Sequence, residues 1–130
     1  MIEKFNDLLE QAQQQTDAQR LLFLFAASDV VKKAKKRDEK KGTLSPVMCV
    51  DKLPAEIDSF KALASEADGI TQDWDMVLIA ALSGEGAKAP TTEEAEPFLN
   101  KMANDLSSGQ DLSRYVIFDR KENPIVIQAA

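Results

Sequence analysis

The run L-L-F-L-F-A-A at residues 21–27 decides the fold, because it is apolar throughout and shows no alternation of polar and apolar side chains. A strand with one face in water alternates the two kinds, whereas a strand covered on both faces need not. A second run of this kind, M-V-L-I-A-A-L, occupies residues 76–82. We therefore predict that both runs are strands of a parallel or mixed sheet with covered faces, and that the second strand is central.

Helices around these runs are predicted from apolar residues at helical spacing. The first runs from residue 2 to near residues 16–17, the second from residue 54 to Gly69, and the third from residue 91 to just before Gly109. Pro54 suits the first turn of the second helix, because the N–H group that proline lacks would have no partner there. Thr91 and Glu94 open the third helix with the spacing of a capping box, in which each side chain accepts a hydrogen bond from the other residue's backbone N–H group.

Three shorter strands complete the predicted sheet. They lie at residues 46–54, 115–118 and 124–128, and a polar turn joins the last two into an antiparallel hairpin. Strands that are connected through helices run parallel by right-handed crossover. The predicted architecture is an α/β, three-layer single domain with a mixed five-stranded sheet, helices packed on it and a C-terminal β-hairpin.

Length and composition indicate one globular domain that spans residues 1–130. Hydrophobic residues make up 44% and charged residues 29%, close to the average of soluble globular proteins. The longest apolar run is far shorter than the roughly 20 residues of a membrane-spanning helix, and it is not N-terminal as in a signal peptide. We expect a cytoplasmic protein with no membrane partner.

The lack of histidine excludes several chemistries at once. Imidazole activates the nucleophile in Ser-His-Asp and Cys-His sites and is a ligand in the common zinc motifs. Cys49 is the one cysteine of the chain, and its place between apolar residues of a predicted strand favours a role in the core. The sequence therefore predicts no metal, no cofactor and no catalytic residue.

The glycine-rich segment at residues 81–94, A-L-S-G-E-G-A-K-A-P-T-T-E-E, raises the alternative of a phosphate-binding loop. The P-loop pattern needs wider glycine spacing and leads directly into a helix, whereas Pro90 intervenes here. Glu93 and Glu94 also place negative charge in the first turn of the predicted helix, where a phosphate would bind. A connector that ends in a self-capped helix is the better interpretation.

Polar pairs follow three of the predicted strands and form the candidate ligand site. If these strands are parallel, their carboxyl ends meet at one edge of the sheet, where ligands bind in open α/β sheets. The candidate residues are Asp51, Lys52, Ser83, Gly84, Asp119 and Arg120. A small molecule or a peptide would bind at this edge.

The segment at residues 32–41, K-K-A-K-K-R-D-E-K-K, is basic although the chain carries a net charge of −6. The candidate anion contacts in it are Lys32, Lys33, Lys35, Lys36 and Arg37. The rest of the chain is acidic, and no aromatic residue lies among the lysines to stack on bases. The sequence therefore favours a solvated segment and argues against a nucleic-acid partner.

Four segments resemble one known family: R-L-L-F-L-F-A from Arg20, P-V-M-C-V-D-K-L-P from Pro46, A-A-L-S-G from Ala80 and F-D-R from Phe118. The family consists of small proteobacterial proteins commonly labelled "ribonucleotide reductase subunit alpha", and the resemblance covers residues 20–124. A reductase large subunit needs a radical cysteine and a redox pair of cysteines, whereas this chain has one cysteine. The resemblance therefore implies a cytosolic protein and carries over no catalytic residue.

The leading hypothesis is a small non-catalytic binding or regulatory protein with a protein or small-molecule partner, working through the strand-end residues and the basic segment. Two alternatives stay open. One is an enzyme on a phosphorylated or nucleotide-like substrate, with Lys52, Lys88 and Arg120 holding the anion and Asp51 or Asp119 as the base. The other is an acidic inhibitor or immunity-type protein that binds a basic partner. Convergent charges in a deep pocket would favour the enzyme, and a flat acidic or apolar patch would favour a protein partner.

Overall fold

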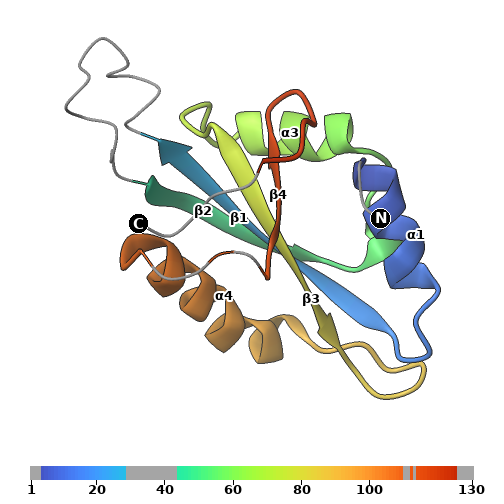
Figure 1. Ribbon diagram of the computed structural model, residues 1–130. Helices are drawn as coiled ribbons and strands as arrows, with labels where there is room; N and C mark the ends of the chain where they lie inside the picture. The colour runs from blue at the N-terminus through green and yellow to red at the C-terminus, as the bar shows by residue number, and fades with distance from the viewer. Residues whose placement is uncertain (1–3, 29–43, 110–111, 113, 126–130) are drawn as a thin grey trace, which may run out of the picture.

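The computed structural model describes residues 4–28, 44–109, 112 and 114–125. Its elements, in chain order, are α1 (Phe5–Gln13), β1 (Gln19–Ser28), β2 (Leu44–Lys52), η2 (Pro54–Glu56), α3 (Phe60–Asp68), β3 (Met76–Ser83), α4 (Thr92–Ser107) and β4 (Val116–Asp119). In Figure 1 the strands form a central sheet, with α1 and α3 on one side of it and α4 on the other. The predicted α/β class, with helices on both faces of a sheet, is confirmed.

The strands pair in the order β2-β1-β3-β4, and every neighbouring pair is antiparallel. The predicted mixed sheet with parallel neighbours is therefore wrong. β2 and β3, which α3 connects, do run in the same direction, but β1 lies between them and pairs with both. β3 and β4, which follow each other with α4 between them in the chain, are neighbours in the sheet and run in opposite directions. A helical connection alone does not decide which strands become neighbours.

The predicted fifth strand and C-terminal hairpin are not established by the described residues. After β4 the chain turns, and Pro124 forms a single antiparallel bridge with Phe118. The N–H group of Ile125 donates a hydrogen bond of 2.8 Å to the carbonyl oxygen of Ile117. Residues 126–130, on which most of the predicted last strand falls, lie outside the described residues. The described sheet thus has four strands.

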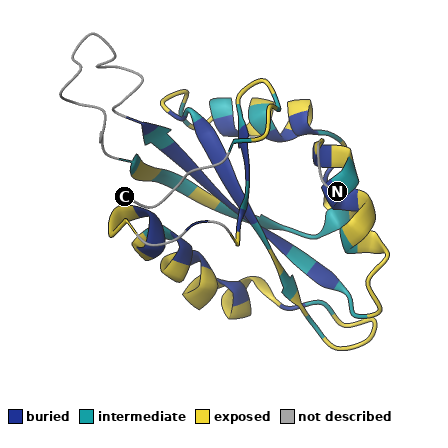
Figure 2. Cartoon of the chain, viewed as in Figure 1, coloured by how far each residue is buried: buried dark blue, intermediate teal, exposed yellow. Residues whose placement is uncertain are grey.

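The first face of the sheet is covered by α1 and α3. Alternate side chains of a strand point to the same face, and Phe23 and Phe25 of β1 are fully buried on this one. Phe5 of α1 meets Phe60 of α3 edge-on, with 5.7 Å between ring centroids, and Trp74 meets Phe25 at 5.0 Å. Figure 2 shows buried residues in α1, α3 and the strands between them. This face therefore has an aromatic core.

The opposite face of the sheet is covered by α4. Leu22 and Leu24 of β1 and Leu78 of β3 are buried there against Leu99 and Met102 of the helix. Both faces of β1 are therefore buried, which explains why its sequence shows no polar alternation. The prediction that the two apolar runs form covered strands is confirmed for residues 21–26 and 76–79, whereas residues 80–82 of the second run are only partly buried or exposed.

The N-terminal capping residues of α4 and α3 show where these two helices begin, which can be compared with the predicted positions. Glu94 donates its N–H to the Thr91 hydroxyl over 3.1 Å, and Thr91 donates its own N–H to the Glu94 carboxylate over 2.9 Å, so the predicted capping box is confirmed. The predicted start of the second helix at Pro54 is wrong. Pro54 opens only the short turn η2, and α3 begins after Ser59, whose hydroxyl accepts from the N–H of Ala62. Proline tolerates a helix start, whereas a serine hydroxyl satisfies one of the free N–H groups.

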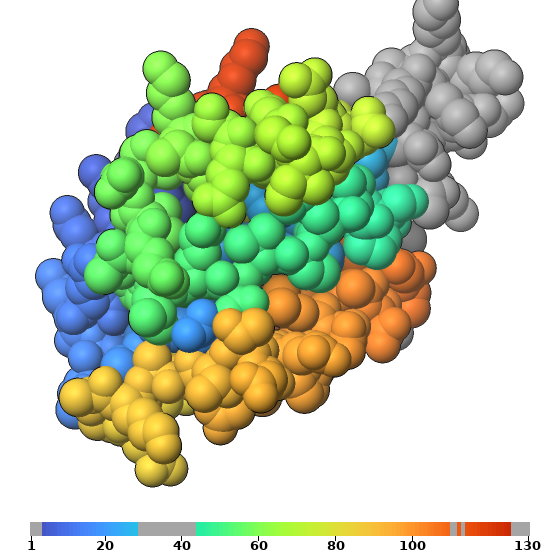
Figure 3. Space-filling model, turned by 180° about the vertical axis from the view of Figure 1, so that it is seen from behind, coloured from blue at the N-terminus to red at the C-terminus, as the bar shows by residue number. Residues whose placement is uncertain are grey.

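β2 is an edge strand, and Figure 3 shows it at the surface between α3 and α4. It pairs with β1 on one side. Cys49 is therefore exposed, and its predicted role in the core is wrong, because a strand at the sheet margin is covered less completely than a central one. Partial burial still raises the pKa of its thiol, which keeps the sulfur in the protonated, weakly nucleophilic form.

Candidate functional site

The second half of β3 has no strand beside it on one side, within the part of the chain that the structure describes. β4 pairs only with the first half of β3, from Met76 to Ile79. β3 continues to Ser83 and pairs with β1 along its whole length. Figure 1 shows β3 running on past the point where β4 begins. We call residues 80–83 the bare edge.

The direction of the backbone groups along the bare edge follows from the antiparallel ladder. In such a ladder the N–H and C=O of one residue point to the same side, and consecutive residues alternate. Gly84 donates its N–H to the carbonyl of Ala18, just before β1, over 2.8 Å, so Gly84 and Leu82 face β1. The N–H and C=O groups of Ala81 and Ser83 therefore point outward, away from β1.

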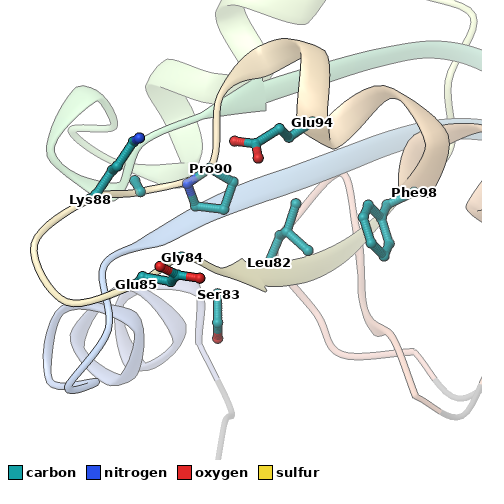
Figure 4. A pocket seen from close by; sticks show the side chains of 9 residues that line it. Leu82, Ser83, Gly84, Glu85, Lys88, Pro90, Glu94 and Phe98 are labelled. Carbon is teal, nitrogen blue, oxygen red and sulfur yellow. The ribbon is translucent and has the colours of Figure 1, made fainter.

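A pocket of about 420 Å³ opens where β3 ends and α4 begins, and we call it the terminal pocket. Figure 4 shows Leu82 from β3, Pro90 from the connecting segment and Phe98 from α4 around it. Its other lining residues are Ser83, Gly84, Glu85, Lys88, Ala89 and Glu94. Phe98 belongs to the apolar stripe of α4, yet 47% of its surface is exposed. A hollow of this size with mixed apolar and polar walls is typical of a binding site.

Two smaller hollows flank the bare edge, one on each face of the sheet. The α1-side hollow has about 200 Å³ and is closed by residues of α1. The α4-side hollow has about 190 Å³ and is closed by Phe98 and Met102 of α4. Ala80, Ala81 and Arg114 line both hollows. Because the alanine side chains are short, the bare edge has open space on both of its faces.

One charged group of the terminal pocket, the Glu94 carboxylate, is held by the local fold. The Glu94 carboxylate accepts a hydrogen bond from the Thr91 N–H, which holds the pKa of Glu94 below its usual range. The backbones of Glu85 and Lys88 bond to each other at the turn, with both distances 2.9 Å. Neither geometry pairs a nucleophile with a base, which acyl or phosphoryl transfer would need.

Four of the six predicted site residues lie at one end of the sheet. Asp51 and Lys52 at the end of β2, and Ser83 and Gly84 at the end of β3, lie beside the start of β1, because both strands are antiparallel to it. Ser83 and Gly84 line the terminal pocket. Lys52 is engaged in an ion pair with Glu66 at 3.0 Å. Of the three predicted pairs, the structure thus brings one to the pocket wall itself and a second to the same end of the sheet.

Arg20 is a residue of this region that the sequence reasoning did not select. Its guanidinium donates to the Asp51 carboxylate over 2.7 Å and to the carbonyl of Pro90 over 2.6 Å. The Thr92 hydroxyl donates to the same Asp51 oxygen over 2.8 Å. Arg20 therefore ties the start of α4 to β1 and β2 and fixes the wall behind the terminal pocket. An arginine directly before the apolar run of β1 was the only signal in the sequence.

Asp119 and Arg120 do not converge with the other four residues. Asp119 pairs with Met76, at the start of β3, which puts both residues at the opposite end of the sheet. The expected convergence required parallel strands. Arg120 donates to the Asp68 carboxylate over 2.8 Å and stacks over the Trp74 ring at 4.2 Å. Its role is to hold the end of α3 against the buried tryptophan.

The Asp119 side chain closes the turn after β4. Its carboxylate accepts hydrogen bonds from the backbone N–H groups of Lys121 and Asn123 over 2.8 and 2.9 Å. Burial alone would raise the pKa of this carboxyl, but the hydrogen bonds from Asn123 and Lys121 outweigh it and lower the pKa. Asp119 is thus a turn residue whose carboxylate oxygens already accept hydrogen bonds.

The candidate anion contacts Lys32, Lys33, Lys35, Lys36 and Arg37 lie outside the described residues.

A buried acid and the one tyrosine of the chain form a pair behind the α4-side hollow. Asp105 of α4 accepts a hydrogen bond from the Tyr115 hydroxyl over 2.7 Å and forms an ion pair with Lys101 at 3.2 Å. The hydrogen bond from Tyr115 lowers the pKa of Asp105. Burial, reinforced by the Asp105 charge, raises the pKa of Tyr115 to about 12. This pair anchors the chain before β4 to α4.

Titration of Tyr115 tests this arrangement. We expect the tyrosinate absorbance, which reports on Tyr115 alone, to rise with a midpoint of about 12 instead of 10.0. Because the folded-state pKa is raised, the neutral hydroxyl adds stability that is fully present below about pH 10 and lost as the pH rises towards 12. The variant Asp105→Asn should titrate at a lower pH, but still above the ordinary value since burial is the larger cause. A midpoint near 10 in the folded parent protein would contradict the burial of this hydroxyl.

Within the described residues, neither a membrane-spanning helix nor a metal-binding cluster of side chains is present. No helix in this part of the chain is long and apolar enough to cross a lipid bilayer. No group of three or more histidine, cysteine, aspartate or glutamate side chains lies close enough in it to hold a metal ion. In this part of the chain, the candidate site consists of the three hollows, the bare edge and single charged side chains.

The chain was compared with known proteins in three ways. Comparisons of the chain with protein-family models, with curated protein sequences and with solved structures gave no match. The resemblance to the small proteobacterial family therefore stays a prediction, and no residue role is taken from it.

Proposed function

We propose that the protein is a small, cytoplasmic, non-catalytic binding protein that captures another protein at the bare edge and the terminal pocket. The observation that carries the proposal is the clustering of hollows. The terminal pocket and both flanking hollows are each lined by residues of the bare edge, between Ala80 and Ser83. This is the same stretch that β4 leaves uncovered. Partner proteins bind to surfaces of this kind, where apolar walls meet unpaired backbone groups.

The exposed aromatic residue at this place supports a protein partner. Within the described residues, Phe98 and Ile70 are the two large apolar side chains that stand out into solvent, at 47% and 69% exposed. Phe98 lines the terminal pocket and the α4-side hollow. Aromatic side chains next to such pockets contribute most of the energy in many protein interfaces. Phe98 is therefore the expected anchor.

The geometry favours binding over the enzyme alternative. That alternative needs Lys52, Lys88 and Arg120 to hold one anion. Lys52 is paired with Glu66 and Arg120 with Asp68, and the two cations lie at opposite ends of the sheet. The acids whose pKa values are lowered are turn, cap or core residues with structural hydrogen bonds. Such perturbations follow from the fold and need no catalytic role.

Affinity capture from native lysate with two matched variants tests the proposal. We expect the parent protein and Ile70→Ala to retain the same proteins, whereas Phe98→Ala loses them. Ile70 follows α3 and lines none of the three hollows, so it controls for the loss of any exposed apolar side chain. Thermal melts of both variants should match the parent. Equal capture by Phe98→Ala, or capture of small molecules alone, would contradict a protein partner at this site.

A further inference from the structure

We propose that the bare edge binds an extended peptide segment by strand addition, and that this segment carries two consecutive apolar residues, one for each face of the sheet, and one acidic residue. The inference deepens the proposed function and rests on it. In strand addition the backbone of the peptide supplies affinity and its alternate side chains supply specificity. Three observations carry it: outward backbone groups, a hollow on each face, and a cation beside both hollows.

The outward backbone groups are those of Ala81 and Ser83. Their N–H and C=O groups point to the side on which β4 pairs with Ile79, and the described part of β4 ends its pairing there. An added strand would continue the ladder at the position that β4 vacates, with two residues able to exchange hydrogen bonds. Unpaired edges of this kind are templates for another strand.

The two flanking hollows match the alternation of an extended peptide. Successive side chains of a strand point to opposite faces of the sheet. A peptide paired with residues 80–83 would direct one side chain into the α1-side hollow and the next into the α4-side hollow, since Ala80 and Ala81 line both. Hollows of about 200 and 190 Å³ suit one branched apolar side chain each. The short alanine side chains leave these spaces open.

The charge of the peptide follows from Arg114. Its side chain is exposed and lines both hollows; its charge contributes to lowering the pKa of Asp105, but it forms no ion pair within the described residues. Its guanidinium lies 5.7 Å from the centroid of the Tyr115 ring, which holds it beside the bare edge. An acidic side chain in the peptide would pair with it. One acid suffices, because the net charge of −6 repels a strongly acidic segment.

The test uses two matched peptide libraries and the full chain. Each library holds extended peptides of about six residues with Val, Ile or Leu at two consecutive positions, and a neighbouring position is Glu in the first library and Gln in the second. We expect the Glu library to contain binders that slow hydrogen exchange at the amides of Ala81 and Ser83. Arg114→Gln should weaken the Glu peptides about three- to fivefold and leave the Gln peptides unchanged.

Backbone pairing is tested separately from charge. Ala81→Pro removes an outward N–H and should weaken the best binder by about tenfold or more. If that variant does not fold, N-methylation of alternate peptide amides gives the same test with an intact protein: one set should abolish binding and the other should not.

Several results would overturn strand addition. Absence of binding by both libraries would do so, and so would binding without protection of Ala81 and Ser83. If those amides are protected in the free protein and become exposed after removal of residues 126–130, the chain's own end occupies the edge. If their protection rises with protein concentration, a second copy occupies it. In each case the parent protein can still capture partner proteins from lysate in a way that depends on Phe98. The failure of this inference is therefore distinguishable from the failure of the proposed function.

Discussion

Phe60→Ala is expected to lower the free energy of unfolding by about 3 to 5 kcal/mol. Phe60 is 7% exposed and its ring meets Phe5 at 5.7 Å and Phe118 at 5.9 Å between centroids. Truncation would remove both edge-on contacts and leave a cavity between α3, α1 and β4 that rigid neighbours cannot fill. Equilibrium unfolding in denaturant measures the loss, provided that the slope with denaturant concentration is unchanged.

The matched control is Phe98→Ala, which deletes the same side chain from an exposed position. Because 47% of Phe98 is exposed, its truncation should cost less than about 1 kcal/mol. The two variants thus separate a core phenylalanine from a binding phenylalanine. A loss below about 1 kcal/mol for Phe60→Ala would mean that the face of α3 does not pack on the aromatic core.

The periodicity of the sequence predicted burial well along the central strands. Residues 21–26 and 76–79 are all apolar, and in a strand this pattern is typical of burial on both faces. Phe60 followed from the apolar stripe of α3 in the same way. The same reasoning was wrong for Phe98, which belongs to an equally regular apolar stripe of α4 but is not buried. Phe98 faces the part of β3 that β4 does not reach, and the length of β4 is not encoded in the helix.

Strand pairing was the part of the fold that local patterns could not supply. An apolar strand is equally well buried beside a parallel or an antiparallel neighbour, so the pattern of β1 leaves its partners open. For the same reason, the sequence could not show which of the candidate site residues lie together. Asp51, Ser83 and Arg120 each lie at or just after the end of a strand, but only the observed pairing decides that the first two share an end of the sheet and the third does not.

The bare edge could not be predicted from the sequence, for a related reason. It exists because β4 covers four residues of β3 and no more, which is a relation between two segments far apart in the chain. Ala80 and Ala81 gave a weak signal, since small residues at the end of an otherwise bulky run leave space beside the backbone. Arg114 gave none, because an isolated arginine is ordinarily a solvated surface residue.

Gly84 is the one predicted site residue whose identity the structure requires on steric grounds. A Cβ atom at this position would overlap the carbonyl oxygen of Lys88 and lie 2.9 Å from the Cα of Ala89. Both obstacles are backbone atoms, so no change of rotamer relieves them. The turn is held in place by the paired hydrogen bonds between Glu85 and Lys88, and by the bond from the Gly84 N–H to the carbonyl of Ala18. An added methyl group must therefore displace the turn as a whole.

We accordingly expect Gly84→Ala to cost about 3 kcal/mol of unfolding free energy, at the upper end of the range for overpacking, because a backbone overlap is relieved only by breaking hydrogen bonds. Gly86→Ala in the same turn is the matched control. Gly86 has a positive φ of 56°, but no atom lies within 4 Å of the place that an added methyl group would take, so it should cost only the strain of about 1 to 2 kcal/mol. Denaturant melts of the two variants decide between close approach and strain. If Gly84→Ala is no worse than Gly86→Ala, the turn does not pack against the end of β3, and the terminal pocket is wider there than its floor of backbone atoms implies.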